Sequence, residues 1–168
     1  DKKQQRTIMK PISIPCYFTV FRADELSHAD RELLSAAQQA ADSSYAPYSQ
    51  FNVGAALRLA DDTVRLGSNQ ENASYGATQC AERNALHHAA CYHPNTAPVA
   101  LAVAARNTSG WLPVPIPPCG ICRQAILETE TRYDHRIRIL LYGTQGTWVC
   151  EGVQNLLPLQ FTGHTMKL

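Results

Sequence analysis

Val99-Ala-Leu-Ala-Val-Ala-Ala105 is a nearly continuous apolar run in the second half of the chain. A strand that is covered on both faces of a sheet has this composition, so the run predicts a central strand. A predicted helix from Gln79 to Tyr92 precedes it. A proline-rich loop, Asn107 to Pro118, follows it and leads into a second predicted helix from Cys119 to about Thr131. A central strand with helices before and after it indicates a layered α/β protein.

Four further strands complete the predicted sheet. Phe51 to Leu59 and Thr63 to Ser68 form a hairpin around a two-aspartate turn, and Arg138 to Gly143 and Thr147 to Glu151 follow the second helix. A hairpin first, with helix and strand alternating later, predicts a three-layer α/β/α sandwich around one mixed five-stranded sheet.

The N-terminal part of the chain reads differently from the rest. Residues 1–25 are expected to be a polar tail and an extended arm, in which Ile12 to Phe21 is rich in strand-forming residues and is either a short strand or extended chain. Ser27 then has the character of a helix N-cap, with Asp30 three residues later as a variant of the capping box. Apolar residues at helical spacing extend this helix to about Asp42. Residues 26–168 are expected to form a single domain, because 168 residues suit one core.

Charge and hydropathy exclude several classes of protein. Lys and Arg number 15 against 14 Asp and Glu, so no bulk attraction to nucleic acid is expected. No apolar run approaches the roughly 18 residues of a membrane span, so no membrane partner is expected. Six cysteines in a chain of this size favour thiol ligands in a reducing compartment over a disulfide framework, which predicts a cytoplasmic protein.

Two cysteine motifs carry the chemistry. Cys80-Ala81-Glu82 opens the first predicted helix, and Pro118-Cys119-Gly-Ile-Cys122 opens the second. They supply three thiolates and one carboxylate that is not needed as a ligand. A structural zinc site closes with four protein ligands, whereas a catalytic site keeps the fourth position for water. The motifs therefore predict a catalytic zinc site at Cys80, Cys119 and Cys122, with Glu82 as its base.

Three other interpretations compete with this one. Cys119 and Cys122 could be a thioredoxin-like redox pair, which leaves Cys80 and Glu82 unexplained. A closed structural zinc site would need a fourth ligand, and the nearest histidines, at positions 87 and 88, lie roughly 10–12 Å from Cys80 along a regular helix. Inert burial in the core is the third interpretation, and it is the expected fate of the remaining cysteines, Cys16, Cys91 and Cys150.

Arg83 has a predicted role beside the metal. Three thiolates and one Zn²⁺ ion sum to a charge of minus one, which weakens the acidifying effect of the ion on its water. Arg83 lies three residues after Cys80, close enough on a helix to donate hydrogen bonds to ligand sulfur and to withdraw charge. A solvated arginine on a polar helix face is the alternative.

Several motifs, in order along the chain, resemble the cytidine deaminase family. The similarity covers about Leu26 to Phe161. The stretches that carry it are Ser44-Tyr-Ala-Pro-Tyr-Ser-Gln-Phe51-Asn-Val-Gly-Ala-Ala56, Asn69-Gln-Glu-Asn-Ala-Ser-Tyr75, Cys80-Ala-Glu-Arg83, Pro118-Cys-Gly-Ile-Cys-Arg-Gln124 and Leu156-Leu-Pro-Leu-Gln-Phe161.

This resemblance implies an enzyme of pyrimidine salvage. It implies hydrolytic deamination of cytidine and 2′-deoxycytidine to uridine and 2′-deoxyuridine with release of ammonia, and one Zn²⁺ per subunit. Glu82 is implied as the residue that moves the proton of the attacking water to the pyrimidine. The alternatives are a deaminase of another aminopyrimidine nucleoside, such as an antibiotic nucleoside, and a non-catalytic zinc-stabilised scaffold.

The resemblance also implies which residues bind the nucleoside. Asn69 and Glu71 would hydrogen-bond the ribose 3′-hydroxyl, although both could be solvated groups of a turn. Phe161 would reach the pocket of a neighbouring subunit, or else pack on its own domain, and Tyr75 could be core, pocket wall or interface. The complete implied set of substrate-binding residues is Phe51, Asn69, Glu71, Tyr75, Ala81 and Phe161. A cysteine-first zinc motif is typical of the homotetrameric branch of the family.

Four departures from the family pattern are visible. Pro117 stands where a small polar residue is usual, and its carbonyl still offers an acceptor for the substrate amine. Ile121 replaces an alanine between the zinc cysteines, so altered packing near the metal is expected. The loop from Asn107 to Pro117 is longer than usual, and the arm before Leu26 is an addition.

Overall fold

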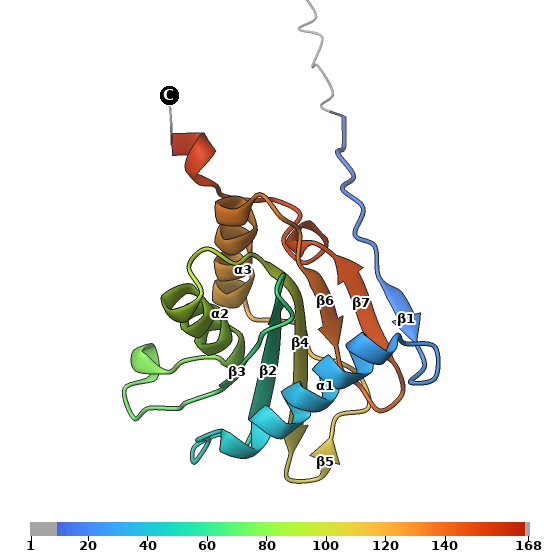
Figure 1. Ribbon diagram of the computed structural model, residues 1–168, viewed down its shortest axis with the longest axis vertical. Helices are drawn as coiled ribbons and strands as arrows, with labels where there is room; N and C mark the ends of the chain where they lie inside the picture. The colour runs from blue at the N-terminus through green and yellow to red at the C-terminus, as the bar shows by residue number, and fades with distance from the viewer. Residues whose placement is uncertain (1–9, 167–168) are drawn as a thin grey trace, which may run out of the picture.

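The computed structural model describes residues 10–166, and the part of the predicted tail at residues 1–9 lies outside that range. Its centre is one mixed seven-stranded sheet in the order β1-β7-β6-β4-β2-β3, with β5 paired to β4 (Figure 1). The central strand β4 runs antiparallel to β2 and parallel to β6. The strands are β1 Thr19–Phe21, β2 Asn52–Leu59, β3 Val64–Ser68, β4 Pro98–Asn107, β5 Gly110–Trp111, β6 Arg138–Leu141 and β7 Thr147–Glu151.

Helices cover both faces of the sheet. α1 (His28–Ala40) packs on one face, and α2 (Ala81–Tyr92) and α3 (Gly120–Tyr133) pack on the other (Figure 1). This confirms the predicted α/β/α sandwich. Among the described helices, none has both the length and the apolar character that a membrane crossing requires. Four short 3₁₀ turns complete the described elements: η1 Ala41–Ser43, η2 Tyr75–Ala77, η3 Val153–Asn155 and η4 Gly163–Met166.

The apolar run that predicted the central strand contributes side chains to two separate cores. Leu101 and Val103 of β4 point toward α2 and α3, and the alternating alanines at positions 100, 102 and 104 point toward α1. Because side chains alternate along a strand, one continuous apolar segment serves both layers. The small side chains on the α1 face leave room for that helix to lie close to the sheet.

The sheet has two strands more than the five predicted, and one of them, β1, lies within the Ile12 to Phe21 stretch for which a short strand or an extended arm was expected. β1 adds to the edge of β7, because Phe18 packs against the core under α2 and α3 while Phe21 packs against the core under α1. β5 arises inside the predicted loop, where Gly110, with φ of 112°, closes a tight turn and pairs with Asn107 of β4. Both strands are only two or three residues long, so their sequence pattern is weak.

The start of α1 was predicted correctly only in part. The Ser27 hydroxyl accepts a hydrogen bond from the Asp30 backbone N–H, as expected of an N-cap. The Asp30 carboxylate, instead of completing a capping box, accepts hydrogen bonds from the Arg138 guanidinium, at 3.0 Å for the closest pair. Asp30 therefore ties α1 to the sheet.

Two glycines bring helices unusually close to strands. A Cβ atom on Gly67 of β3 would lie 2.2 Å from the Ala81 carbonyl oxygen in the first turn of α2. A Cβ atom on Gly54 of β2 would lie 1.9 Å from the Ala37 carbonyl oxygen of α1. Only glycine permits these approaches, and the first one fixes where α2 begins.

Candidate functional site

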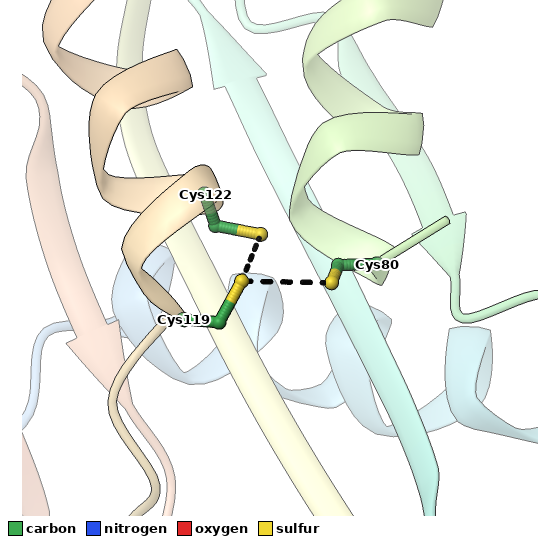
Figure 2. A group of neighbouring side chains, drawn as sticks. All are labelled: Cys80, Cys119 and Cys122. Carbon is green, nitrogen blue, oxygen red and sulfur yellow. Dashed lines mark hydrogen bonds between the residues drawn. The ribbon is translucent and has the colours of Figure 1, made fainter. Parts of the chain in front are cut away.

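Three cysteine sulfurs converge where two helices begin (Figure 2). Cys80 is the N-cap residue of α2, Cys119 is the N-cap residue of α3, and Cys122 lies in the first turn of α3. The sulfur of Cys119 is 3.7 Å from that of Cys80 and 3.5 Å from that of Cys122. All three sulfurs lie within 4.8 Å of one another. The predicted ligand set is therefore assembled from two helix starts that are 39 residues apart in sequence.

The spacing of these sulfurs fits a single zinc ion. Thiolates bound at about 2.3 Å in tetrahedral geometry stand about 3.8 Å apart, close to the separations found here. Within residues 10–166, no His, Asp or Glu joins the group. His87 and His88 are exposed on α2, and the His88 ring packs against Tyr92. The group thus offers three ligands and matches a site that keeps one position open.

The cysteine environment favours negative charge on sulfur. Hydrogen bonding from the Cys122 thiol, followed by Arg83, lowers the pKa of Cys80 to about 5. The pKa of Cys122 is raised, first because its thiol donates to Cys80 and then because it is buried. One thiolate is therefore stabilised even before a cation is added, which is the form that binds metal.

Arg83 lies beside the cluster as expected. Its Nη2 donates to the Thr78 carbonyl oxygen at 3.1 Å and lies 4.0 Å from the Cys80 sulfur. Its Nε is buried and has no hydrogen-bond partner among the described residues. The Cys80 sulfur in turn raises the pKa of Arg83 against the opposing effect of burial. Arg83 is thus a cation held against ligand sulfur by its neighbours.

Glu82 is buried in the first turn of α2, with only 5% of its surface exposed. Burial is the main cause of its raised pKa, and the nearby Cys80 sulfur adds to it. A buried carboxylate next to a cluster of metal ligands is unusual, because burying a charge costs free energy unless the charge is used or paired.

A cavity of about 380 Å³ opens in front of Glu82 and the cysteines. It brings together eight of the residues singled out from the sequence: Phe51, Asn69, Glu71, Cys80, Ala81, Glu82, Pro117 and Cys119. The sequence did not single out its remaining lining residues as pocket residues: Ser49, Val53, Thr78, Gln79 and Ile116. Thr78 and Gln79 directly precede Cys80, so their adjacency was an available signal. The course of the loop that carries Ile116 was not predictable from local pattern.

Asn69 and Glu71 are held in place by backbone groups. The Asn69 side chain accepts from the Val53 N–H at 2.8 Å and donates to the Phe51 carbonyl at 2.9 Å. Glu71 accepts from the backbone N–H groups of Tyr48 and Ser49 and from the Ser49 hydroxyl. The hydroxyl bond is the main cause of the lowered pKa of Glu71. These are fixed polar groups of a structured loop, in contrast to the solvated turn considered as an alternative.

Other predicted residues lie outside this cavity. Tyr75 lines an adjoining cavity of about 340 Å³ with Tyr48, and the two rings meet edge to face. Phe161 is 60% exposed, and its carbonyl accepts a hydrogen bond from Gln124. Ile121 is 64% exposed on the surface of α3, so the expected altered packing near the metal is not seen.

The prediction for the remaining cysteines holds for one of three. Cys150 is buried, and burial raises its pKa to about 12. Cys16 and Cys91 are exposed, so the prediction that they lie in the core was wrong. Cys16 precedes β1 on the extended arm, and Cys91 lies on the outer side of the last turn of α2.

Comparison with known proteins places the chain in a family. The family model for the cytidine and deoxycytidylate deaminase zinc-binding region matches residues 27–134. A cytidine deaminase of Halalkalibacterium halodurans is 42% identical over 142 residues, 82% of this chain and 98% of the relative. A cytidine deaminase of Mycobacterium tuberculosis is 41% identical over 105 residues, 61% of this chain and 74% of the relative. The crystal structure of cytidine deaminase from Burkholderia pseudomallei, at 38% identity, matches with a TM-score of 0.67 and covers 81% of this chain and 100% of that one. The chain belongs to the cytidine and deoxycytidylate deaminase family.

Proposed function

We propose that this protein catalyses the zinc-dependent hydrolysis of cytidine and 2′-deoxycytidine to uridine and 2′-deoxyuridine with release of ammonia. The observation that carries the proposal is a buried carboxylate, Glu82, beside three converging cysteine sulfurs at the base of one cavity. Relatives that carry the name cytidine deaminase support the choice of substrate.

Cys80, Cys119 and Cys122 would hold one Zn²⁺ ion per subunit. When bound, zinc supplies Lewis-acid chemistry that makes a water molecule acidic enough to act as a nucleophile near neutral pH. Arg83 withdraws negative charge from the Cys80 sulfur, to which it lies close. That withdrawal preserves the acidifying effect of an ion that is surrounded by three thiolates.

Glu82 moves the protons of the reaction. It takes a proton from the attacking water and delivers it to N3 of the pyrimidine, while oxygen bonds to C4. It then helps to protonate the amine, which leaves C4 as ammonia, so water is added and ammonia is lost. The buried position of Glu82 in the wall of the cavity supports this role, because bulk water is kept from the carboxylate.

The polar rim of the cavity selects a free nucleoside. Asn69 and Glu71 bind the ribose 3′-hydroxyl, with Glu71 accepting its hydrogen bond. A carboxylate at this position repels a phosphate ester, so free nucleosides are favoured over polynucleotides. Phe51 and Ala81 line the apolar part of the cavity and contact the nucleoside. The backbone bonds that hold Asn69 and Glu71 support a preformed site.

The active unit is a homotetramer in which pockets are shared. Phe161 reaches a neighbouring subunit and covers the base, and Tyr75 contributes at the interface. The exposure of both aromatic side chains in a single chain supports this assignment. Residues 26–168 form the catalytic domain, with residues 1–25 as its tail and arm. A place in cytoplasmic pyrimidine salvage agrees with a ligand set of three thiolates, which needs a reducing compartment.

An absorbance assay tests the proposal. Zinc-replete protein should remove the cytidine and deoxycytidine absorbance bands, and should form uridine or deoxyuridine and ammonia in equal amounts. Absence of turnover with both nucleosides would rule the proposal out. A non-catalytic scaffold predicts instead that E82Q keeps both zinc and biological effect, so a lost effect in that variant rejects the scaffold.

A further inference from the structure

One part of the cavity wall comes from an unusual segment. Residues 112–118, Leu-Pro-Val-Pro-Ile-Pro-Pro, connect β5 to Cys119 and are called here the proline strap. Ile116 and Pro117 of this strap line the cavity. Each proline ring fixes one backbone dihedral, so four prolines in seven residues make the strap stiff. A displacement of Pro113 or Pro115 is therefore expected to move the neighbouring Ile116 and Pro117.

Backbone hydrogen bonds fasten the beginning of the strap to two elements. The Leu112 N–H donates to the Ala105 carbonyl of β4 at 3.2 Å. The Thr144 N–H donates to the Leu112 carbonyl at 3.0 Å, and the Gln145 N–H donates to the Pro113 carbonyl at 3.1 Å. The turn at residues 143–146, between β6 and β7, thus holds the beginning of the strap through two backbone hydrogen bonds.

Gly143 sits at the point of closest contact between this turn and the strap. A Cβ atom on Gly143 would lie 2.7 Å from the Pro113 carbonyl oxygen and 2.7 Å from Cδ of Pro115. Neither neighbour is the end of a flexible side chain, so neither can move aside locally. Gly143 is not among the residues with positive φ, so space and not backbone conformation demands glycine here.

We propose that Gly143 is a positioning residue for the nucleoside site. Because it has no side chain, Gly143 allows Pro113 and Pro115 to pack against the turn. This packing determines the position of Ile116 and Pro117 in the cavity wall, and therefore the affinity for the nucleoside. The inference rests on the proposed function, because it takes this cavity to be the nucleoside site. Only Cys119 of the cysteine cluster adjoins the strap, and it is also the N-cap residue of α3, while Cys122 lies within α3 and Cys80 begins α2.

Two variants test the inference. G143A inserts the clashing methyl group. Thr144→Ala is the matched control, because its side chain is exposed and its backbone bond to Leu112 is retained. Cytidine kinetics, bound zinc, thermal unfolding and amide hydrogen exchange at Leu112, Thr144 and Gln145 are measured for each.

The inference predicts that G143A raises KM for cytidine about tenfold while kcat changes less than about threefold, since a displaced wall removes uniform binding. One zinc per subunit is retained. The Leu112, Thr144 and Gln145 amides exchange faster in G143A than in wild type. Thr144→Ala matches wild type. A purely structural role would lower the melting temperature without this division between KM and kcat.

A folded G143A protein with wild-type KM and wild-type exchange overturns the inference. If G143A does not fold, Pro115→Gly provides the same test by softening the strap without adding a clash. It should raise KM, and a wild-type KM in that variant overturns the inference. If the wild-type protein does not turn over cytidine, the proposed function is contradicted. The hydrogen-exchange measurement needs no substrate, so it tests the contact between strap and turn independently of the proposed function.

Discussion

The contacts of Arg83 could be predicted from the sequence only in part. Its distance from Cys80 in sequence predicted contact with ligand sulfur, and its Nη2 does lie 4.0 Å from that sulfur. The contact with the Thr78 carbonyl, which holds the guanidinium in place, was not predicted. Helical spacing specifies which residues of α2 share a face, but it contains no information about the loop before the helix.

Replacing Arg83 by alanine should lower turnover of cytidine by about 10- to 100-fold, because groups that orient metal ligands have effects of that size. The melting temperature should change little, since Arg83 belongs to neither apolar core. Kinetics and thermal unfolding of zinc-loaded protein make the comparison. Arg83→Lys keeps the charge but not the planar donor geometry, so it should recover only part of the activity. Full turnover in the alanine variant would remove Arg83 from the account.

At the level of the elements, the sequence predicted long helices and strands well and short ones poorly. The apolar run of β4 and the helix starts at Cys80 and Cys119 have strong local signals, and all are confirmed. β1 and β5 depend on partners elsewhere in the sheet, so their existence is decided by tertiary pairing and not by local pattern. The same holds for the contact of Gly67 with α2, which joins residues 14 and more positions apart.

Gly67→Ala should both destabilise the protein and disturb the metal site. The new methyl group would press on the backbone of Ala81 and Ala85 and push the start of α2 away from β3. We expect a loss of about 3 kcal/mol or more in the free energy of unfolding, together with weaker zinc binding. Gly54→Ala is the matched control, since its clash is with α1 on the other face of the sheet. It should destabilise similarly but keep its zinc, and equal zinc loss in both variants would refute this role of Gly67.

At the scale of the whole molecule, the sequence indicated the site through motifs and the fold explains why those motifs meet. Cys80 and Cys119 come together because α2 and α3 pack side by side on one face of the sheet and begin at the same end (Figures 1 and 2). The cavity walls supplied by Ile116 and Ser49 depend on loop paths that no periodicity encodes. Contacts with a second copy of the chain are also beyond local pattern, so the proposed contact of Phe161 with a neighbouring pocket has to be tested by experiment.

Size measurement tests the shared pocket. Gel filtration with light scattering should give the mass of four chains, and Phe161→Ala should raise KM for cytidine while zinc content stays at one per subunit. The control is Leu159→Ala, which removes a similarly exposed apolar side chain two residues away. A monomer with full activity would contradict the assignment of Phe161 to a neighbouring pocket.

In the proposed reaction, Glu82 carries out proton transfer beside a zinc ion held by three cysteines. The most direct measurement compares wild type and E82Q, both loaded with zinc, for uridine and ammonia formed from cytidine and for metal bound. We expect one zinc per subunit in both proteins, equal amounts of uridine and ammonia from wild type, and turnover lower by about 10²- to 10⁴-fold in E82Q. Wild-type turnover in zinc-loaded E82Q would show that Glu82 does not transfer the proton.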